Sequence, residues 1–441
     1  MTTRELEASR KRLEGFAGEM LDSLPYRRQS HWAQVYLRGL LLEGRRKSCQ
    51  PMAERLPDGD EQCLQQFLNQ SPWDWEQVRE AIAKKMSAAL GEGGGWIVDD
   101  TGFPKQGKHS VGVARQYSGT LGKRGNCQVG VSISYATAKG AMPLEWALYL
   151  PKEWTDDRSR CERVGVPAQV QFQTKWQLAL ELIDRVLSWG VPAPEVVVTD
   201  AGYGSTTEFR QGLTARQLRY VAEVEHTLAA WTEPQQRKQP VRQAGRMGRP
   251  RVPKYTNAPL PANLKVIALA LPSSAWRKVT WREGTKGKMS SRFARLRVQP
   301  AHGWQQGKEE LPAVWLLMEW PTEAKAPTKY WLSDLPEDTT RRTLVRWAKR
   351  VPWRLEMNYR ELKDHLGLDH FEGRGWAGWH HHVTMVMLAF AFVLSERLRR
   401  RKGGQSSPFP RSWAGSSSFS PPGPASALSV ASPFPAARGM I

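Results

Sequence analysis

Three acidic segments could assemble a metal site. The runs GGGWIVDDTGFPKQG and PEVVVTDAGYG place Asp99, Asp100 and Asp200 directly after apolar, strand-like stretches, and the helix-like run WRLEMNYRELK carries Glu356. Carboxylates gathered from such distant segments repel one another unless a divalent cation neutralises them. Two such cations about 3.5–4 Å apart are the usual device for breaking or joining phosphodiester bonds. These residues therefore predict a two-metal phosphodiester chemistry.

Each Asp also has a purely structural explanation, because Asp before Gly commonly starts a turn. Neighbouring residues of a strand face opposite ways, so only one of Asp99 and Asp100 can face the site. Ligands bind at the carboxyl ends of strands in α/β sheets, and both acidic segments lie at such ends. We therefore expect one acid of the first pair to act together with Asp200.

On residues alone, the helical acid Glu356 has two explanations. Glu356, Tyr359 and Lys363 share one helix face through steps of three and four, which is also the spacing of a surface salt-bridge face. Glu361 lies in the same helix but points elsewhere. Lys363 is placed to reach a DNA phosphate beside the metals.

The composition favours a polyanionic partner. The 441 residues include 64 Lys+Arg against 43 Asp+Glu, for a net charge of +21 and a pI near 10. Such an excess is typical of proteins that bind nucleic acid. Some of the 20 Trp could stack on unpaired bases. The four widely spaced cysteines form no CxxC pair, so they indicate neither zinc nor disulfides and fit a reducing cytosol.

The elements that must position the acids follow from periodicity. Residues 1–90 are predicted to form a helical N-terminal domain that binds DNA ends, although a plain helical bundle packed on the next domain is an equal alternative. In residues 91–225 the order is strands, helix, strand, helix, strand, which is the order of a ribonuclease-H-like α/β core. The overall prediction is an α/β protein with such a catalytic core.

Residues 226–335 are predicted to be a mostly β insertion that starts with a basic loop. Its strand candidates are LKVIALAL, WRKVTWREG, FARLRVQP, AVWLLMEW and TKYWLSDLP. Residues 336–401 are expected to be the helical last part of the core, and residues 402–441 a disordered tail rich in Ser, Pro, Gly and Ala. The apolar stretch Val383–Leu394 is too short to span a bilayer, and no secretory signal begins the chain, so no membrane is expected.

Two minor motifs carry weaker signals. Arg249 and Arg251 lie in a Gly-Arg-Pro-Arg run that resembles an AT-hook core, which would bind the DNA minor groove; a solvated loop is the alternative. His380, His381 and His382 are adjacent on a predicted helix, so their side chains diverge and joint metal binding is not expected.

Taken together, these runs resemble bacterial insertion-sequence transposases of the DDE class, in the branch with a Tyr-Arg-Glu-Lys signature and a β insertion. The resemblance covers most of residues 30–398. The runs that carry it are YLRGLLLEGRRKS, DDTGFPKQGKHSVGVARQYSGTLGKRGNCQVGVSISYA, VVTDAGYG, YWLSDLP and LKDHLGLDHFEGRGWAGWHHH.

The resemblance also selects among the candidate acids. The spacing of the family's signature Glu and Lys matches Glu356 and Lys363, so it implies Glu356 rather than Glu361. The family's first Asp stands two residues before Thr or Ser, which matches Asp99, with Asp100 as the alternative.

One position departs from the family. The signature Arg is expected four residues before the Glu, and Pro352 stands there. Arg350 or Arg354 could bind DNA in its place, together with Tyr359 and Lys363. The Ser- and Pro-rich tail is also unlike the family.

The resemblance implies a Mg²⁺-dependent transposase in which Asp99, Asp200 and Glu356 hold two metal ions, with Mn²⁺ as a possible substitute. It would act as a homodimer on double-stranded DNA, in the bacterial cytoplasm near the nucleoid, cutting the terminal inverted repeats and joining target DNA through a hairpin. A flipped base would stack on a Trp of the insertion. The candidates are Trp276, Trp281, Trp304 and Trp315. The alternatives are an inactive or domesticated copy that represses by binding DNA, and a structure-specific nuclease.

Overall fold

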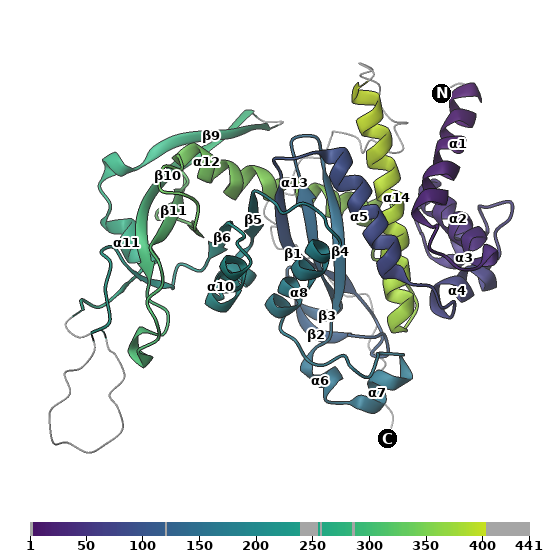
Figure 1. Cartoon of the computed structure of the whole chain (residues 1–441), viewed down its shortest axis with the longest axis horizontal. Coiled ribbons are helices and arrows are strands. Elements are labelled where there is room, and N and C mark those ends of the chain that lie inside the picture. Colours follow the sequence, from purple (N-terminus) through teal and green to yellow (C-terminus); the bar gives the residue numbers. More distant parts are fainter. Residues whose placement is uncertain (1–2, 120, 239–254, 256–257, 285–286, 403–441) are drawn as a thin grey trace, which may run out of the picture.

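The protein is built around one long mixed sheet with helices on its faces and at one end (Figure 1). The computed structural model describes residues 3–119, 121–238, 255, 258–284 and 287–402. The described strands run in the order β2-β3-β1-β5-β6-β12-β11-β10-β7-β8, with β4 beside β3 and β9 beside β10. The mixed α/β class is thus confirmed. Arg249, Arg251 and the predicted tail from residue 403 onward lie outside the described residues.

Helices form most of the described residues between 3 and 90. The helices are α1 (Thr3–Met20), α2 (Arg27–Leu41), α3 (Cys49–Ala53), α4 (Glu61–Asn69) and α5 (Trp75–Leu90). The last of them, α5, packs against strand β4 and against the long C-terminal helix α14 (Trp376–Lys402), so it also covers the core sheet. A separate domain ending at residue 90 stays a prediction.

The strands and the two longer helices of the core follow in the predicted order, with the additional short helices α6, α7 and α9 between them. They are β1 (Gly95–Pro104), β2 (Ala114–Ser118), β3 (Lys123–Ala136), β4 (Ala141–Tyr149), α6 (Lys152–Thr155), α7 (Arg158–Arg163), α8 (Lys175–Ser188), β5 (Val196–Thr199), α9 (Ala201–Gly204), α10 (Thr207–Ala215) and β6 (Tyr220–Val224). Strand β1 pairs antiparallel with β3 and parallel with β5, and β5 pairs parallel with β6. The four residues of β5 are all buried, as expected for a strand covered on both faces.

The insertion continues the core sheet. Its elements are β7 (Ala229–Trp231), β8 (Ala262–Asn263), α11 (Leu264–Ala270), η1 (Ser273–Ala275), β9 (Arg277–Gly284), β10 (Gly287–Pro300), η2 (Trp304–Gln306), β11 (Val314–Trp320) and β12 (Lys329–Ser333). Strand β12 pairs with both β11 and β6, so it joins the insertion to the core.

The prediction of a strand for LKVIALAL was wrong, because this segment is helix α11. The side chains of Leu264, Ile267 and Ala268 are buried, whereas Val266 is 56% exposed and Leu269 is 49% exposed. Burial at steps of three and four is the helical period, so tertiary packing covers one stripe of a run that is apolar all round.

One helical run joins the insertion to the core. It consists of α12 (Arg341–Val345), the π-helical turn η3 (Arg346–Arg350) and α13 (Val351–Asp364). Helix α12 packs on β9, β10 and β11, whereas α13 packs on β1, β3, β4 and β5. Pro352 is the second residue of α13, which directly follows the π turn. A proline lacks the N–H that an interior helical position would donate, and π turns commonly mark such irregular points.

The two faces of the sheet are covered by different helices. Ile97, Val198 and Leu355 belong to an apolar cluster with residues of α12 and η3, while Val98 and Val197 belong to a second cluster with residues of α8 and α14. Helix α14 is, among the described residues, long and apolar enough to cross a membrane by composition, but 94% of its most apolar window is buried inside the protein. It therefore packs as a core helix.

Candidate active site

A cavity of about 400 Å³ beside the middle of β1 and the carboxyl end of β5 contains all three predicted acids. Asp200 directly follows β5, as predicted, and Glu356 lies on α13. The prediction that Asp99 and Asp100 end a strand was wrong, because β1 continues through both residues to Pro104 by pairing with β3. The remaining lining residues are Ile97, Val98, Val198, Thr199, Glu223, Trp281, Arg282, Lys329, Trp331, Ala348, Lys349, Pro352 and Leu355. Core strands form one side of this cavity, and the insertion and the helical run form the other.

Strand register brings the two aspartates together. The parallel pairing of β1 and β5 ends with Val98 opposite Thr199, so the next residues along the chain are Asp99, still within β1, and Asp200, directly after β5. Asp200 is the N-cap of α9, and its Oδ1 accepts hydrogen bonds from the backbone N–H groups of Gly202 (3.0 Å) and Tyr203 (3.3 Å). Gly204 closes this turn tightly, since a Cβ there would lie 2.0 Å from the backbone oxygen of Glu223. The Ala-Gly-Tyr-Gly run thus holds Asp200 at the strand end.

The carboxylates repel one another. Burial, followed by the charges of Asp200 and Asp100, raises the pKa of Asp99 well above its usual range, and Glu356 adds to the effect. Burial and Asp100 also raise the pKa of Asp200, against the two backbone N–H groups that lower it. Within the described residues, Asp99, Asp200 and Glu356 form no ion pair. The cavity therefore has the electrostatics of a cation site.

Asp100 faces the other side of the sheet from Asp99. Its Oδ2 accepts hydrogen bonds from Nζ of Lys175 on α8 (2.9 Å) and from the hydroxyl of Tyr203 (3.2 Å). Lys175 already neutralises the charge of this carboxylate, so a metal ion would gain less by binding Asp100 than by binding Asp99. These contacts support Asp99 as the first acid.

The two helical glutamates also differ. Glu356 is exposed and lines the cavity. Glu361 instead forms a salt bridge with Arg397 of α14, with an Nη1–Oε2 distance of 2.8 Å. The structure thus brings Glu356, and not Glu361, to the two aspartates.

The donor set suits a hard divalent cation, because carboxylate oxygens are the ligands that Mg²⁺ and Mn²⁺ prefer. The described residues nevertheless contain no group of three His, Cys, Asp or Glu side chains arranged closely enough to hold a metal ion as they stand. The chemistry and charge of Asp99, Asp200 and Glu356 therefore suit a divalent cation. The three side chains share one cavity, but they do not form a compact coordination shell.

The predicted DNA-binding residues of α13 contact the sheet. The Tyr359 hydroxyl lies 2.6 Å from Oγ of Ser132, and Nζ of Lys363 donates to the backbone oxygen of Gly102 at 2.9 Å. Burial lowers the pKa of Lys363, partly offset by Asp369. Both contacts direct the side chains of Tyr359 and Lys363 toward the sheet and away from the outer surface. Their binding to DNA stays a prediction. The side chains of Arg350 and Arg354 lie outside the described part of the structure.

Several cavity residues were missed by sequence reasoning. Glu223 of β6 pairs with Lys329 of β12 (2.9 Å), and Lys349 of η3 pairs with Glu319 (2.9 Å). The Glu223–Lys329 ion pair forms because β12 lies beside β6. No local sequence pattern predicts that these two strands are neighbours.

One of the four Trp candidates lines the cavity. This is Trp281 of β9, and the ammonium of Lys349 lies 5.0 Å from its ring centroid. Trp276 packs edge-on against Trp320, and Trp304 packs edge-on against Trp231. Trp315 donates its ring N–H to the backbone oxygen of Pro336.

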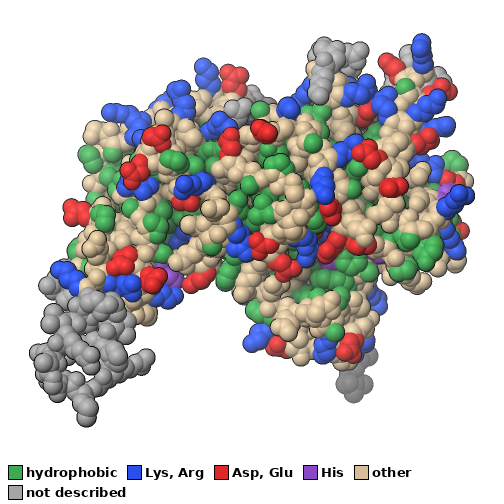
Figure 2. Space-filling model, viewed as in Figure 1, with side chains coloured by type: hydrophobic (Ala, Val, Ile, Leu, Met, Phe, Trp, Pro, Cys, Tyr) green, Lys and Arg blue, Asp and Glu red, His purple; other side chains and the backbone are tan. Residues whose placement is uncertain are grey.

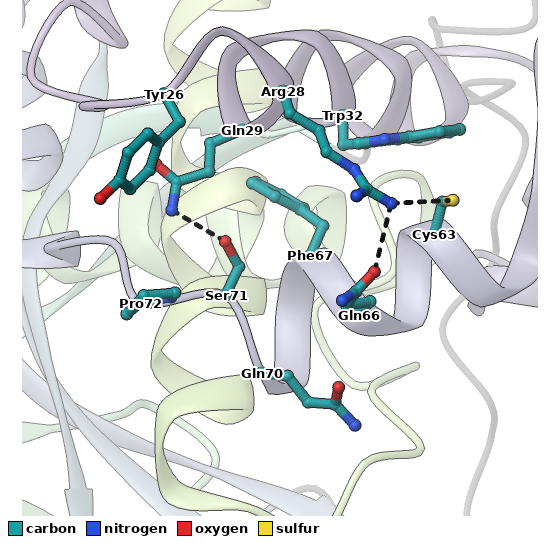
Figure 3. A pocket seen from close by; sticks show the side chains of 10 residues that line it. All are labelled: Tyr26, Arg28, Gln29, Trp32, Cys63, Gln66, Phe67, Gln70, Ser71 and Pro72. Atoms are coloured by element: carbon teal, nitrogen blue, oxygen red, sulfur yellow. Dashed lines mark hydrogen bonds between the residues drawn. The ribbon is translucent and has the colours of Figure 1, made fainter.

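A second hollow of about 380 Å³ lies among the N-terminal helices (Figure 3). Tyr26, Trp32 and Phe67 provide aromatic walls, and Arg28 reaches across to Gln66. No carboxylate lines this hollow, so it cannot serve the metal chemistry predicted here.

The three consecutive histidines are core residues. His381 contacts the backbone oxygens of Leu68 and Trp73, and His382 contacts the Tyr36 hydroxyl at 2.8 Å. Burial lowers the pKa of His381 to about 4 and that of His382 to about 3. His380 lies against the guanidinium of Arg79, which is buried and paired with Glu145. Their side chains diverge, as predicted.

Residues 19–288 match the family described as DDE superfamily endonuclease, and the chain belongs to this family. The match includes Asp99 and Asp200 and ends before Glu356. The chain is also similar to a probable transposase for insertion sequence element IS701 from Microchaete diplosiphon, with 29% identity over 188 residues. That alignment covers 42% of this chain and 46% of the relative, so the chain spans less than half the length of that protein. The predicted DDE family is confirmed.

Proposed function

We propose that this chain is a transposase that cuts DNA at the terminal inverted repeats of an insertion sequence and joins the freed ends to target DNA. The observation that carries the proposal is the cavity lined by Asp99, Asp200 and Glu356, none of which forms an ion pair among the described residues. Membership of the endonuclease family supports hydrolysis of phosphodiesters. The partial similarity to a probable transposase supports insertion-sequence ends as the substrate.

The sheet order supports a ribonuclease-H-like core. Strands β4, β3, β1, β5 and β6 lie side by side, with antiparallel pairs up to β1 and parallel pairs beyond it. This arrangement places β1 and β5 next to each other in the core sheet, so the middle of β1, with Asp99, lies beside the end of β5, which Asp200 follows.

Each group of the cavity has a role in the proposed reaction. Asp99, Asp200 and Glu356 would hold two Mg²⁺ ions, which supply charge neutralisation, an activated water and stabilisation of the leaving oxygen. Lys329 and Lys349 line the cavity, so an entering phosphodiester meets ammonium groups there. Trp281 offers a ring face on which a flipped base of a hairpin end could stack.

The surface supports DNA as the partner. Lys and Arg side chains are spread over the visible face from the insertion to the N-terminal helices (Figure 2). The net charge of +21 would make binding strongly dependent on salt. Two element ends must be held together for transposition, so we propose a homodimer on DNA.

The test is cleavage of DNA that carries the inverted repeats flanking the coding sequence, with and without Mg²⁺. Wild type should nick and then open these ends with Mg²⁺, and Asp99→Asn and Asp200→Asn should bind them without cutting. Binding of the ends without any cutting by wild type would favour the second candidate, a DNA-binding repressor. Pro352, at the position of the family's signature Arg, is the observation that favours that candidate.

A further inference from the structure

Three arginines gather where α12 covers the strands of the insertion. Arg341 is the first residue of α12, Arg277 begins β9, and Arg295 lies on β10. Figure 1 shows α12 lying over these strands, and their packing is direct. Burial, together with the charges of Arg295 and Arg277, lowers the pKa of Arg341. We refer to these three residues as the arginine cluster.

The arginine cluster has no acidic partner in the described part of the chain. Within the described residues none of its three members forms an ion pair, whereas the neighbouring Arg297 pairs with Glu337 at 3.5 Å. The residues outside the described ranges include no Asp or Glu in the sequence. Three like charges at one place, with no carboxylate partner, create a positive potential that an anion would relieve.

The cluster also holds unused hydrogen-bond donors. Nη1 of Arg295 and Nε of Arg341 are buried without a partner among the described residues. The guanidinium carbon of Arg295 lies 4.4 Å from the ring centroid of Trp315, so aromatic stacking holds this side chain. Arg341 donates through Nη2 to the backbone oxygen of Ala275 at 3.3 Å. Guanidinium groups held in this way are suited to the oxygens of a phosphate.

We propose that the arginine cluster binds one backbone phosphate of the DNA, at a point separate from the acid cavity. The proposal rests on the proposed function, which supplies DNA as the ligand. Arg341 and Glu356 lie on the same helical run, and their separation of 15 residues corresponds to roughly 20 Å. The bound phosphate therefore lies several nucleotides away from the one that is cut, where it fixes the position of the strand.

The experiment measures binding of a 30-base-pair duplex to the full chain by fluorescence anisotropy over a series of salt concentrations. The variants are Arg295→Gln, Arg341→Gln and the double variant. The control is Arg216→Gln, because Arg216 is already paired with Asp184 through an Nε–Oδ1 distance of 2.6 Å. Thermal unfolding without DNA is measured for every variant.

Each cluster variant should bind about tenfold more weakly and lose about one unit from the slope of log affinity against log salt. The double variant should also lose about one unit, not two, because both arginines serve one phosphate. Their unfolding temperatures should equal or exceed that of wild type, since a repulsion has been removed. The control should bind as wild type does.

Three results would overturn the proposal. Cluster variants that bind with the wild-type slope would show that no phosphate lies there, while the proposed function stands. Weaker binding accompanied by a lower unfolding temperature would show that the arginines support the fold. A wild type that does not bind DNA would overturn the proposed function itself.

Discussion

The backbone N–H of Asp100 donates to Oδ1 of Asp99 at 2.7 Å, yet the two carboxylates have opposite surroundings. Asp99 faces other acids in the cavity, and Asp100 faces Lys175 across the sheet. A pair of adjacent aspartates can thus combine a repelled carboxylate, ready for a cation, with a neutralised one that fixes the strand.

Asp99→Asn should abolish cleavage and raise the unfolding temperature of the metal-free protein. Asn keeps the shape but removes the charge on which Asp200 and Glu356 act. Asp100→Asn should have the opposite effect on stability, a loss of up to about 1 kcal/mol, because its ion pair with Lys175 is partly exposed. Calorimetry with a cleavage assay checks both. A more stable Asp100→Asn that cannot cut DNA would reverse the assignment.

Glu356→Gln should remove cleavage while leaving binding to the ends within about twofold. Glu361→Gln is the matched control, because it makes the same chemical change in the same helix but breaks the pair with Arg397. The control should still cut, with a somewhat lower unfolding temperature. Gel assays of binding and cleavage on one substrate distinguish the two; an inactive Glu361→Gln beside an active Glu356→Gln would contradict the choice.

Pro352→Arg should increase cleavage several-fold. Pro352 lines the acid cavity, so a guanidinium there could hold the phosphate beside the acids, where small misplacements are costly. Pro352→Ala is the control, since it restores the backbone N–H without adding a charge. The measurement is the cleavage rate of wild type and both variants under single-turnover conditions. Equal rates for the Arg and Ala variants would assign any gain to the helix backbone.

Trp281→Ala should reduce hairpin formation about fivefold or more and leave the first nick intact. The loss is expected because an aromatic face contributes about 1–3 kcal/mol per stacked base. Trp304→Ala is the comparison, because Trp304 packs on Trp231 away from the cavity. Denaturing gels separate nicked from hairpin ends. Normal hairpins from Trp281→Ala would exclude it as the stacking residue.

The contribution of His381 and His382 to stability should fall as the pH decreases from about 6.5 towards 4. His381 and His382 have folded-state pKa values below the ordinary 6.5, so the unfolded chain binds more protons in this range. As the pH falls through this range, each histidine lowers the free energy of unfolding by about 1.4 kcal/mol per pH unit. Above pH 6.5 this loss is absent. His382→Gln should reduce the slope by that amount in denaturant titrations. An unchanged slope would mean that His382 titrates normally.

Local sequence patterns predicted the acids and most of the strands, because strands and turns depend mainly on residues that are close in the sequence. The apolar run before Asp200 indicated a buried strand, and the Gly residues after it indicated a tight turn. By contrast, LKVIALAL is apolar all round, so only tertiary packing decides between strand and helix. The wall formed by Glu223, Lys329 and Lys349 depends on the pairing of β12 with β6, for which the sequence has no local signal.

The pairing of β12 with β6 also makes the insertion necessary for the structure of the core. Without β12, strand β6 would become a sheet edge with unpaired backbone N–H and C=O groups, since β5 occupies only its other side. Exposed edges of this kind promote aggregation between chains. A shortened protein in which the insertion is replaced by a linker should therefore be recovered as aggregate, and a minimal nuclease from this scaffold would have to retain β12 or cover β6 in another way.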